Sequence, residues 1–334
     1  MNVLPRNTIL AGDARERLSG LLAESVDCVI TSPPYYRLRD YADAPGQLGQ
    51  ERTVDEWVAN LRGVFGEVGR VLKPHGSVWL NLGDGYSRHR TWGAPPKSLL
   101  AGPERLLLGL MADGWLCRSK IIWSKRNPLP QSAADRLSAT YEVVYFLVRQ
   151  PSYYFDLDAI RVAHRSIERA GRPRPGEAGR TYVGGNSGLG ALKAAGLVGH
   201  PSGKNPGDVW TLPTASCRAE HYATFPEALV ERPLLATCPE RICVQCDRPW
   251  RRPVRVLTAH TNEGTRMVRK IGDLIRCACF APARPGVVLD PFFGTGTVGA
   301  VAARLDRDWL GIELSPAYRR LAKKRLSRKT GEAA

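Results

Sequence analysis

Apolar residues in the first third of the chain follow two patterns, a spacing of three and four typical of helices and short runs typical of strands. Residues 54–72 place Val, Trp, Leu and Phe at intervals of three and four, which predicts an amphipathic helix that ends before Pro74 and Gly76. The short apolar runs Val26–Thr31 and 77–82 have the length of strands. Strands that alternate with helices predict a parallel sheet covered by helices.

The same patterns place the remaining elements. Strands are expected at 7–13, 116–123, 141–148, 286–290 and 309–314, and helices at 14–22, 98–111, 225–236, 297–305 and from Ser315 onward. Residues 164–208 are rich in glycine and basic residues and lose all periodicity. A loop or a mobile basic arm is therefore expected between the two ordered parts of the chain.

Composition narrows the class of protein. Hydrophobic residues make up 43% of the 334 residues, which excludes a disordered or fibrous chain. Lys and Arg number 48 against 32 Asp and Glu, and the net charge of +16 favours a polyanionic partner. No apolar run approaches the ~20 residues of a membrane helix, and the N-terminus lacks a signal-peptide pattern. We therefore expect a cytoplasmic protein without membrane association.

Five of the eight cysteines lie in one segment. Cys243 and Cys246 form a CxxC pair, and Cys277 and Cys279 form a CxC pair further along. Four thiolates from two such pairs fit a tetrahedral zinc ion. A set of buried or free thiols is the alternative, and a redox-active CxxC is disfavoured because no thioredoxin-like pattern surrounds it.

A glycine-rich loop follows the predicted strand at 286–290. Residues 294–299 read G-x-G-x-x-G between a strand and a helix, a spacing that lets the backbone approach a ligand closely. Glu313 lies at the tip of the next strand, where a carboxylate suits ribose hydroxyls. A dinucleotide site and a tight turn without a ligand are the alternatives.

A second turn with a distinctive composition, TSPPYY at 31–36, ends the predicted strand Val26–Thr31. Two prolines fix φ and leave their carbonyl groups as rigid acceptors. A carbonyl and a Ser hydroxyl beside an aromatic ring can hold the exocyclic amine of a flipped nucleobase. A loop merely stiffened by proline is the alternative.

Together the two turns resemble those of the S-adenosylmethionine-dependent DNA amino-methyltransferases, in their permuted β-class arrangement. In that family the Ser/Asp-Pro-Pro-Tyr motif comes before the target-recognition region and the Phe-x-Gly-x-Gly motif comes last. The resemblance covers most of the chain, and its patches follow the family's order. They are Gly12-Asp13, TSPPYY at 31–36, Arg39-Asp40-Tyr41 with Gly46-Gln47-Leu48-Gly49, WLNLGD at 79–84, IIWSKRNPLP at 121–130, Asp135-Arg136, HYATFP at 221–226, DPFFGTGT at 290–297 and GIEL at 311–314.

The resemblance implies the roles of individual residues. The catalytic turn is Ser32, Pro33, Pro34 and Tyr35, with Ser32 and the Pro33 carbonyl holding the amine and Tyr35 stacking on the base. The cofactor residues are Asp13, Phe225, Pro226, Asp290, Phe292, Gly294, Gly296, Thr297 and Glu313. Within this set, Glu313 takes the ribose hydroxyls and Asp13 meets the adenine amine.

The resemblance also implies a fold and a division of the chain. We expect a Rossmann-like, seven-stranded, mostly parallel sheet with helices on both faces, entered by the chain at its middle. Residues 1–150 form the catalytic half, and 220–237 with 286–330 form the cofactor-binding half. Residues 151–219 form the target-recognition region. The insertion 238–285 is a departure from the shorter members of the family, and from its cysteines and basic residues we expect a small zinc-ribbon-like lobe that contacts DNA phosphates.

The expected activity is site-specific methylation of double-stranded DNA by a prokaryotic or phage protein associated with the nucleoid. A Ser at the first motif position favours cytosine N4, with adenine N6 as the alternative. A zinc-dependent DNA-binding protein with an inactive methyltransferase fold and a nicotinamide oxidoreductase are rival hypotheses. The sequence leaves open whether a second copy of the chain or a cognate restriction enzyme is a partner.

Overall fold

The computed structural model describes residues 4–38, 47–163, 203–214, 225–261 and 264–331, with the backbone alone described at 254–271 and 328–331. Most of the predicted basic arm and the motif segments at 39–46 and 221–224 lie outside the described residues. Among the described residues, no helix is long and apolar enough to span a membrane.

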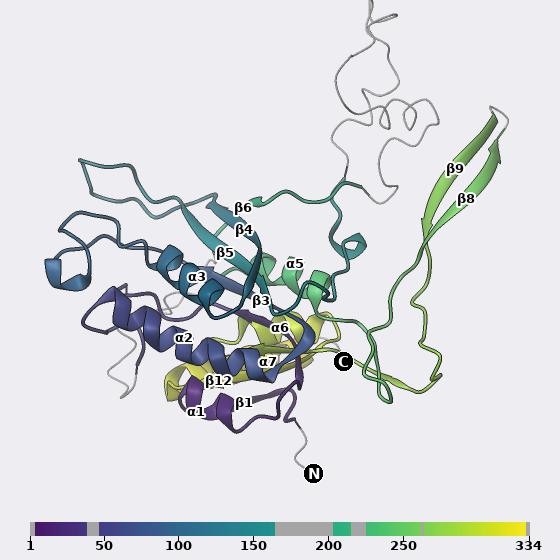
Figure 1. Cartoon of the computed structure of the whole chain (residues 1–334), viewed down its shortest axis with the longest axis horizontal. Helices are drawn as coiled ribbons and strands as arrows, with labels where there is room; N and C mark the ends of the chain where they lie inside the picture. The colour runs from purple at the N-terminus through teal and green to yellow at the C-terminus, as the bar shows by residue number, and fades with distance from the viewer. Residues whose placement is uncertain (1–3, 39–46, 164–202, 215–224, 262–263, 332–334) are drawn as a thin grey trace, which may run out of the picture.

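The centre of the molecule is an eight-stranded sheet with the order β1-β12-β11-β2-β3-β5-β4-β6 (Figure 1). Its strands are β1 (Thr8–Ala11), β2 (Val26–Thr31), β3 (Leu72–Leu82), β4 (Leu116–Lys125), β5 (Tyr141–Val148), β6 (Val209–Leu212), β11 (Val287–Asp290) and β12 (Asp308–Glu313). The pairings of β5 with β3 and β4 are antiparallel, and the other described pairings in this sheet are parallel. This confirms the mostly parallel α/β fold.

Helices cover both faces of the sheet. They are α1 (Ala14–Ser19), α2 (Val54–Val71), α3 (Gly102–Ala112), α5 (Glu227–Thr237), α6 (Thr297–Arg304) and α7 (Pro316–Gly331), with short 3-10 turns η1 (Arg90–Trp92) and η2 (Asp158–Ile160). Residues of α1, α2 and α3 share one buried cluster with the sheet, and residues of α5, α6 and α7 share the other.

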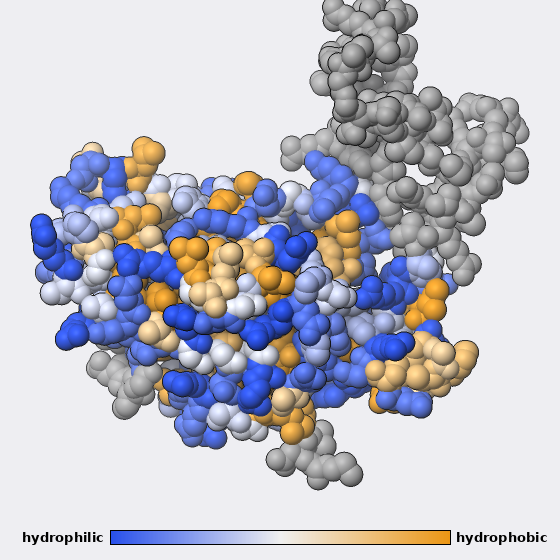
Figure 2. Space-filling model, viewed as in Figure 1, coloured by the Kyte–Doolittle hydropathy of each residue, from blue (hydrophilic) through white to orange (hydrophobic). Residues whose placement is uncertain are grey.

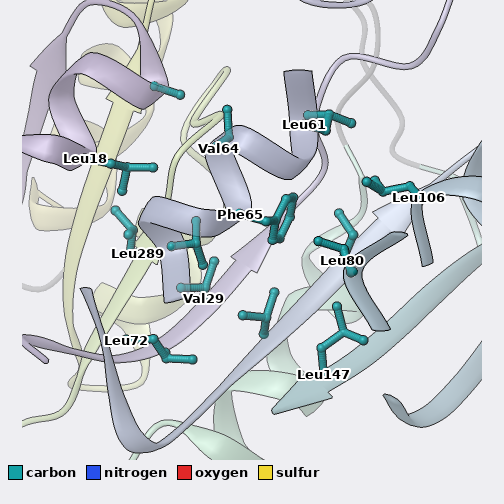
Figure 3. Packing of buried hydrophobic residues seen from close by; sticks show 14 of the residues in the cluster. Leu18, Val29, Leu61, Val64, Phe65, Leu72, Leu80, Leu106, Leu147 and Leu289 are labelled. Atoms are coloured by element: carbon teal, nitrogen blue, oxygen red, sulfur yellow. The ribbon is translucent and has the colours of Figure 1, made fainter. Parts of the chain in front are cut away.

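The two clusters follow from the alternation of side chains along the strands. Leu80 of β3 packs with Phe65 and Leu106 on the first face (Figure 3). Its neighbour Trp79 points to the second face and stacks on Phe146, with ring centroids 4.4 Å apart. Buried strands with apolar residues on both faces are typical of helix-covered parallel sheets.

Two expectations about the sheet are wrong. The sheet has eight strands rather than seven, because β6 pairs in parallel with β4 and becomes the outermost strand on that side. The chain also enters at an edge and not at the middle. β1 pairs with β12 and is held there by contacts from Arg6 and Asn7 to Asp308, at 3.0 and 2.9 Å. β2 is the first strand in the centre of the sheet.

The expected helix at 98–111 begins later, at Gly102. Residues before it form a turn, in which the Leu100 N–H donates to the Gly85 carbonyl at 2.9 Å and the Ser87 N–H donates to the Ser98 carbonyl at 2.8 Å. Ala101 has a left-handed φ of +53° and marks the helix start. These contacts join segments that the sequence separates, and the helical periodicity does not reveal them.

The insertion forms a lobe with two small sheets. One pairs β7 (Ile242–Cys243) with β10 (Ala283–Arg284), and the other is the hairpin of β8 (Val254–Thr261) and β9 (Gly264–Ile271), which projects away from the central sheet in Figure 1. On the face shown in Figure 2, hydrophobic residues form small patches separated by hydrophilic ones.

Candidate active site

The catalytic turn begins where β2 ends, at the carboxyl edge of the sheet. The indole nitrogen of Trp57, on α2, donates to the Pro34 carbonyl at 2.9 Å. The expectation that both proline carbonyls are free acceptors is therefore wrong for Pro34, whose carbonyl anchors the turn to α2. A Cβ at Gly49, whose φ is +95°, would lie 2.9 Å from the Tyr35 carbonyl oxygen, so a glycine is needed for this close approach.

The Ser32 and Tyr35 side chains meet inside the turn. The Ser32 Oγ lies 3.0 Å from the Tyr35 hydroxyl. That hydroxyl donates to Glu142 Oε2 at 2.7 Å, and Glu142 comes from the start of β5. The Tyr35 ring packs on Gly83, where an added Cβ would lie 2.7 Å from the ring. The ring is thus held on its Cδ2–Cε2 side and at its hydroxyl end.

Three polar residues that the sequence analysis did not single out complete this network. Asn81 Nδ2, on β3, donates to the Tyr35 hydroxyl at 2.7 Å and to Glu142 Oε2 at 2.9 Å. Lys125 Nζ, at the end of β4, pairs with Glu142 Oε1 at 2.7 Å. The one sequence signal was Asn81 itself, a polar residue within the apolar run WLNL. Nothing local links Glu142 to Tyr35, 107 positions away.

The glycine-rich loop joins β11 to α6 next to the catalytic turn, because β11 pairs with β2. Asp290 is buried, and its Oδ1 accepts from the Thr31 hydroxyl at 2.7 Å and from the Phe292 N–H at 3.0 Å. Burial raises the pKa of Asp290 to about 7. Asp290 therefore ties the glycine-rich loop to the strand that carries the catalytic turn.

Glu313 lies at the end of β12 and closes the other side of the loop. Its Oε2 accepts from the Gly294 N–H and its Oε1 from the Ser315 N–H, both at 2.7 Å. Burial raises the pKa of Glu313. Gly294 and Gly296 have φ of +51° and +78°, a conformation that favours glycine.

The other predicted cofactor residues surround this loop. Asp13 caps α1 directly after β1, beside Glu313, whose carbonyl accepts from the Gly12 N–H at 3.2 Å. Phe225 is half-buried against the second core cluster, and Pro226 caps α5. Arg325 of α7 donates to Thr297 Oγ1 at 2.9 Å and to Glu227 of α5 at 2.8 Å. These contacts bring the start of α5 to the loop despite the long insertion between them.

A cavity of about 630 Å³ lies beside the catalytic turn. Tyr36 and Arg37, which directly follow the turn, line it on one side, and Asp84 lines it from the segment after β3. Burial raises the pKa of Asp84. The Arg136 guanidinium lies 3.9 Å from the centroid of the Tyr86 ring at the cavity wall. Flat, cationic and polar groups thus meet in a cavity whose lining includes the residues that directly follow Tyr35.

The four cysteines predicted as metal ligands come together. The sulfur atoms of Cys243, Cys246, Cys277 and Cys279 all lie within 4.8 Å of one another. Tetrahedral Zn–S bonds of about 2.3 Å separate the sulfurs by about 3.8 Å, so this set fits a zinc ion. Backbone N–H groups of Cys246 and Gln245 lower the pKa of Cys243 to about 7. Cys238 is buried apart from the set.

The lobe is attached at the amino-terminal ends of the central strands, whereas the catalytic turn lies at their carboxyl ends. Asp27, near the start of β2, is fully buried and pairs with Lys73 Nζ at 3.0 Å. Asp247, which follows Cys246, contacts both Lys73 and Arg284. We call Asp27, Lys73, Asp247 and Arg284 the amino-edge ion cluster. At about 3.3 Å per strand residue, about 16 Å of β2 separate it from Ser32.

Comparison with known proteins places this site in a family. Residues 26–324 match the family model described as DNA methylase. The chain is 33% identical to the Type II methyltransferase M.SmaI of Serratia marcescens, covering 96% of this chain and 91% of that protein. It is 31% identical to M.Cfr9I of Citrobacter freundii, covering 96% and 87%.

Solved structures share the fold. The PvuII DNA methyltransferase (cytosine-N4-specific) aligns with a TM-score of 0.58 at 18% identity, over 97% of this chain and 87% of that chain. A putative DNA modification methylase from Thermus thermophilus, complexed with S-adenosyl-L-methionine, aligns with a TM-score of 0.52 at 23% identity, over 96% and 95%.

The protein is therefore a DNA methylase, since the family model spans most of the chain. More narrowly, it belongs to the S-adenosylmethionine-dependent DNA amino-methyltransferases of the β class, in which the catalytic turn precedes the glycine-rich cofactor loop.

Proposed function

We propose that the protein methylates the N4 amine of cytosine within a specific DNA sequence, as the modification enzyme of a restriction-modification system. The observation that carries the choice of base is Ser32 at the head of the catalytic turn, with its hydroxyl 3.0 Å from that of Tyr35. A neutral hydroxyl stands where the adenine-N6 enzymes more often carry Asp. The structural neighbour with the highest TM-score given above is named as cytosine-N4-specific, and the relatives that cover most of their length are Type II methyltransferases.

The residues around the glycine-rich loop fit S-adenosylmethionine. A Cβ at Gly294 would meet only the Phe292 carbonyl oxygen, at 3.9 Å, which leaves room for close approach of the ligand, and Glu313 presents a fixed carboxylate for ribose hydroxyls. When bound, S-adenosylmethionine supplies an electrophilic sulfonium methyl group. Asp13, Phe225, Pro226, Phe292 and Thr297 would hold the rest of the cofactor. Asp290 acts by holding the loop against β2.

The catalytic turn would orient the amine. The Ser32 Oγ and the Pro33 carbonyl would accept hydrogen bonds from its two N–H groups, which localises the nitrogen lone pair toward the methyl group. The Tyr35 ring, fixed by Gly83 and Glu142, would stack on the flipped base. Such a site accelerates transfer by positioning and by directed hydrogen bonds, and it needs no covalent intermediate.

The identity of the base that receives the methyl group tests this proposal. Incubation with S-adenosylmethionine and unmethylated mixed-sequence duplex DNA, followed by nucleoside mass spectrometry, is expected to yield N4-methylcytosine. Ser32→Ala should abolish the product while S-adenosylmethionine affinity stays within about threefold. N6-methyladenine would overturn the choice of base and keep the reaction. DNA binding without any methylation would favour an inactive methyltransferase fold instead.

We further propose that the four-cysteine set holds a structural zinc ion. Metal analysis of the purified protein should give about one zinc per chain. Cys246→Ser and Cys279→Ser should lower that value to near zero, whereas Cys117→Ser, on β4 outside the set, should leave it unchanged. Less than about 0.1 zinc per chain, with unfolding unaffected by chelator, would overturn the site.

The DNA-recognition regions are proposals as well. We assign residues 151–219 and the lobe 238–285 to contacts with double-stranded DNA, next to a catalytic domain formed by 1–150, 220–237 and 286–330. A cytoplasmic protein that acts beside a cognate restriction enzyme agrees with the Type II relatives. Replacing 254–271 by a short glycine linker should weaken DNA binding and leave S-adenosylmethionine binding intact; unchanged DNA affinity would remove the hairpin from the interface.

A further inference from the structure

The hydroxyl groups of the catalytic turn form a hydrogen-bonded chain with a defined direction. Glu142 is a carboxylate and accepts only, so the Tyr35 hydroxyl donates its proton to Glu142 Oε2, at 2.7 Å. With that proton committed, the Ser32 hydroxyl is the donor in its 3.0 Å contact with the Tyr35 oxygen. The chain therefore runs from Ser32 through Tyr35 and ends on Glu142.

The surroundings hold Glu142 in this role. Its side chain is 14% exposed, and Lys125 pairs with its second oxygen at 2.7 Å. Asn81 is 4% exposed, and its amide must turn its NH₂ group toward Glu142, because its oxygen would repel the carboxylate. Within the described part of the chain the Asn81 Oδ1 has no hydrogen-bond partner. Two donors thus fix both oxygens of the carboxylate.

We propose that Glu142 is a positioning residue that takes up, through Tyr35 and Ser32, the proton released by the target amine. This inference rests on the proposed function. Methylation gives the amine nitrogen a fourth bond and a positive charge, and an N–H bond must break to restore neutrality. Its proton passes to the Ser32 Oγ as the Ser32 proton passes to the Tyr35 oxygen and the Tyr35 proton to Glu142. The N–H electron pair stays on nitrogen, and Glu142 later returns its proton to water.

Glu142→Gln tests this pathway with little change of shape. Lys125 can only donate, so the Gln oxygen will face Lys125 and its NH₂ group will face Tyr35, which removes the acceptor. We expect methyl transfer in a single turnover to slow by about tenfold to a hundredfold, with the Kd for S-adenosylmethionine within twofold of wild type. Glu142→Asp, which keeps a carboxylate, should recover part of the rate.

Two further variants separate this pathway from a structural role. Tyr35→Phe removes one oxygen and keeps the ring, and Tyr35→Phe with Glu142→Gln should be no slower than the slower single variant, since both interrupt one chain. Glu104→Gln is the matched control: Glu104 pairs with Lys120 of β4 at 2.9 Å on the surface. Its rate should equal that of wild type.

Each outcome bears on the inference. Rates of Glu142→Gln within twofold of wild type, or a double variant whose losses multiply, would overturn it. If Glu142→Gln does not fold, Tyr35→Phe decides: a rate within twofold of wild type overturns the pathway, and a loss of tenfold or more supports it. Failure of the wild-type protein to methylate any DNA would refute the proposed function itself, which these comparisons among variants keep separate.

Discussion

Single carboxylates join parts of the site that lie far apart in the sequence. Asp290 accepts from Thr31 of β2 and from Phe292 of its own loop through one oxygen. Glu313 accepts from Gly294 and Ser315 through both of its oxygens. Glu142 fixes the Tyr35 hydroxyl from β5. At each of these positions the length and the charge of the side chain both matter, because the partner atoms are fixed by strands.

Asp290→Asn tests the protonation state of the buried Asp290 carboxyl group. Its folded pKa of about 7 exceeds the unfolded value of about 3.9, so the folded state holds the extra proton between these values. The contribution of protonated Asp290 to the free energy of unfolding is fully present below about pH 4 and is lost as the pH rises through 7. Asn mimics the protonated form and keeps the accepting oxygen. The free energy of unfolding of the variant, relative to wild type, should therefore rise by on the order of 1–4 kcal/mol from pH 4.5 to pH 8.

Denaturant unfolding of both proteins at the two pH values measures this difference. Parallel curves of stability against pH for wild type and variant would show that Asp290 titrates alike in the folded and unfolded chains, contrary to its buried setting.

Most elements could be predicted from the sequence because their signals are local. The amphipathic period of α2, the strand-length run of β2 and the glycines before α6 each lie within one segment. β6 could not be predicted, because four residues next to a glycine-rich stretch become a strand only by pairing with β4. The meeting of Asn81, Lys125 and Glu142 depends on strand order, which local patterns do not determine.

The amino-edge ion cluster links the cysteine lobe to the central strands. Lys73 is buried between Asp27 of β2 and Asp247 of the lobe, and Arg284 contacts both carboxylates. Asp27 also accepts from the Val287 N–H of β11 at 2.8 Å. A buried charge that loses its partner is costly, so the lobe and the strands should unfold together.

Asp27→Asn should lower the free energy of unfolding by about 3 kcal/mol, because it leaves Lys73 with one carboxylate fewer in a buried site. The matched control is Asp135→Asn, which breaks an exposed pair with Lys97 and should cost less than about 1 kcal/mol. Urea denaturation followed by circular dichroism measures both. Equal effects of the two variants would show that the buried cluster does not hold the lobe.

In the whole molecule, the fold brings two loops that lie far apart in the sequence to the same end of the central strands. The catalytic turn comes early in the sequence and the glycine-rich loop comes late, yet their strands are neighbours, because Val288 of β11 pairs with Cys28 of β2. Both loops therefore leave the same edge of the sheet, where parallel α/β proteins bind their ligands. The cysteine lobe is attached at the amino-terminal ends of these strands, so the proposed zinc site and the catalytic turn are spatially separate.

From the net charge of +16 we expect the affinity for DNA to depend on the salt concentration. If basic side chains contact phosphates, binding releases counterions and weakens as salt increases. The affinity for a duplex of about 25 base pairs should fall at least tenfold between 50 and 200 mM salt, as measured by fluorescence anisotropy. An affinity that does not change over this range would show that the excess charge does not face DNA.

The central claim is that this site methylates the N4 amine of cytosine in DNA. The most direct measurement is transfer of labelled methyl groups from S-adenosylmethionine to unmethylated mixed-sequence duplex DNA, with each labelled nucleoside identified by mass spectrometry. We expect labelled N4-methylcytosine from the wild-type protein and none from the Ser32→Ala reaction. Label in N6-methyladenine, or no labelled nucleoside from a protein that binds S-adenosylmethionine, would contradict it.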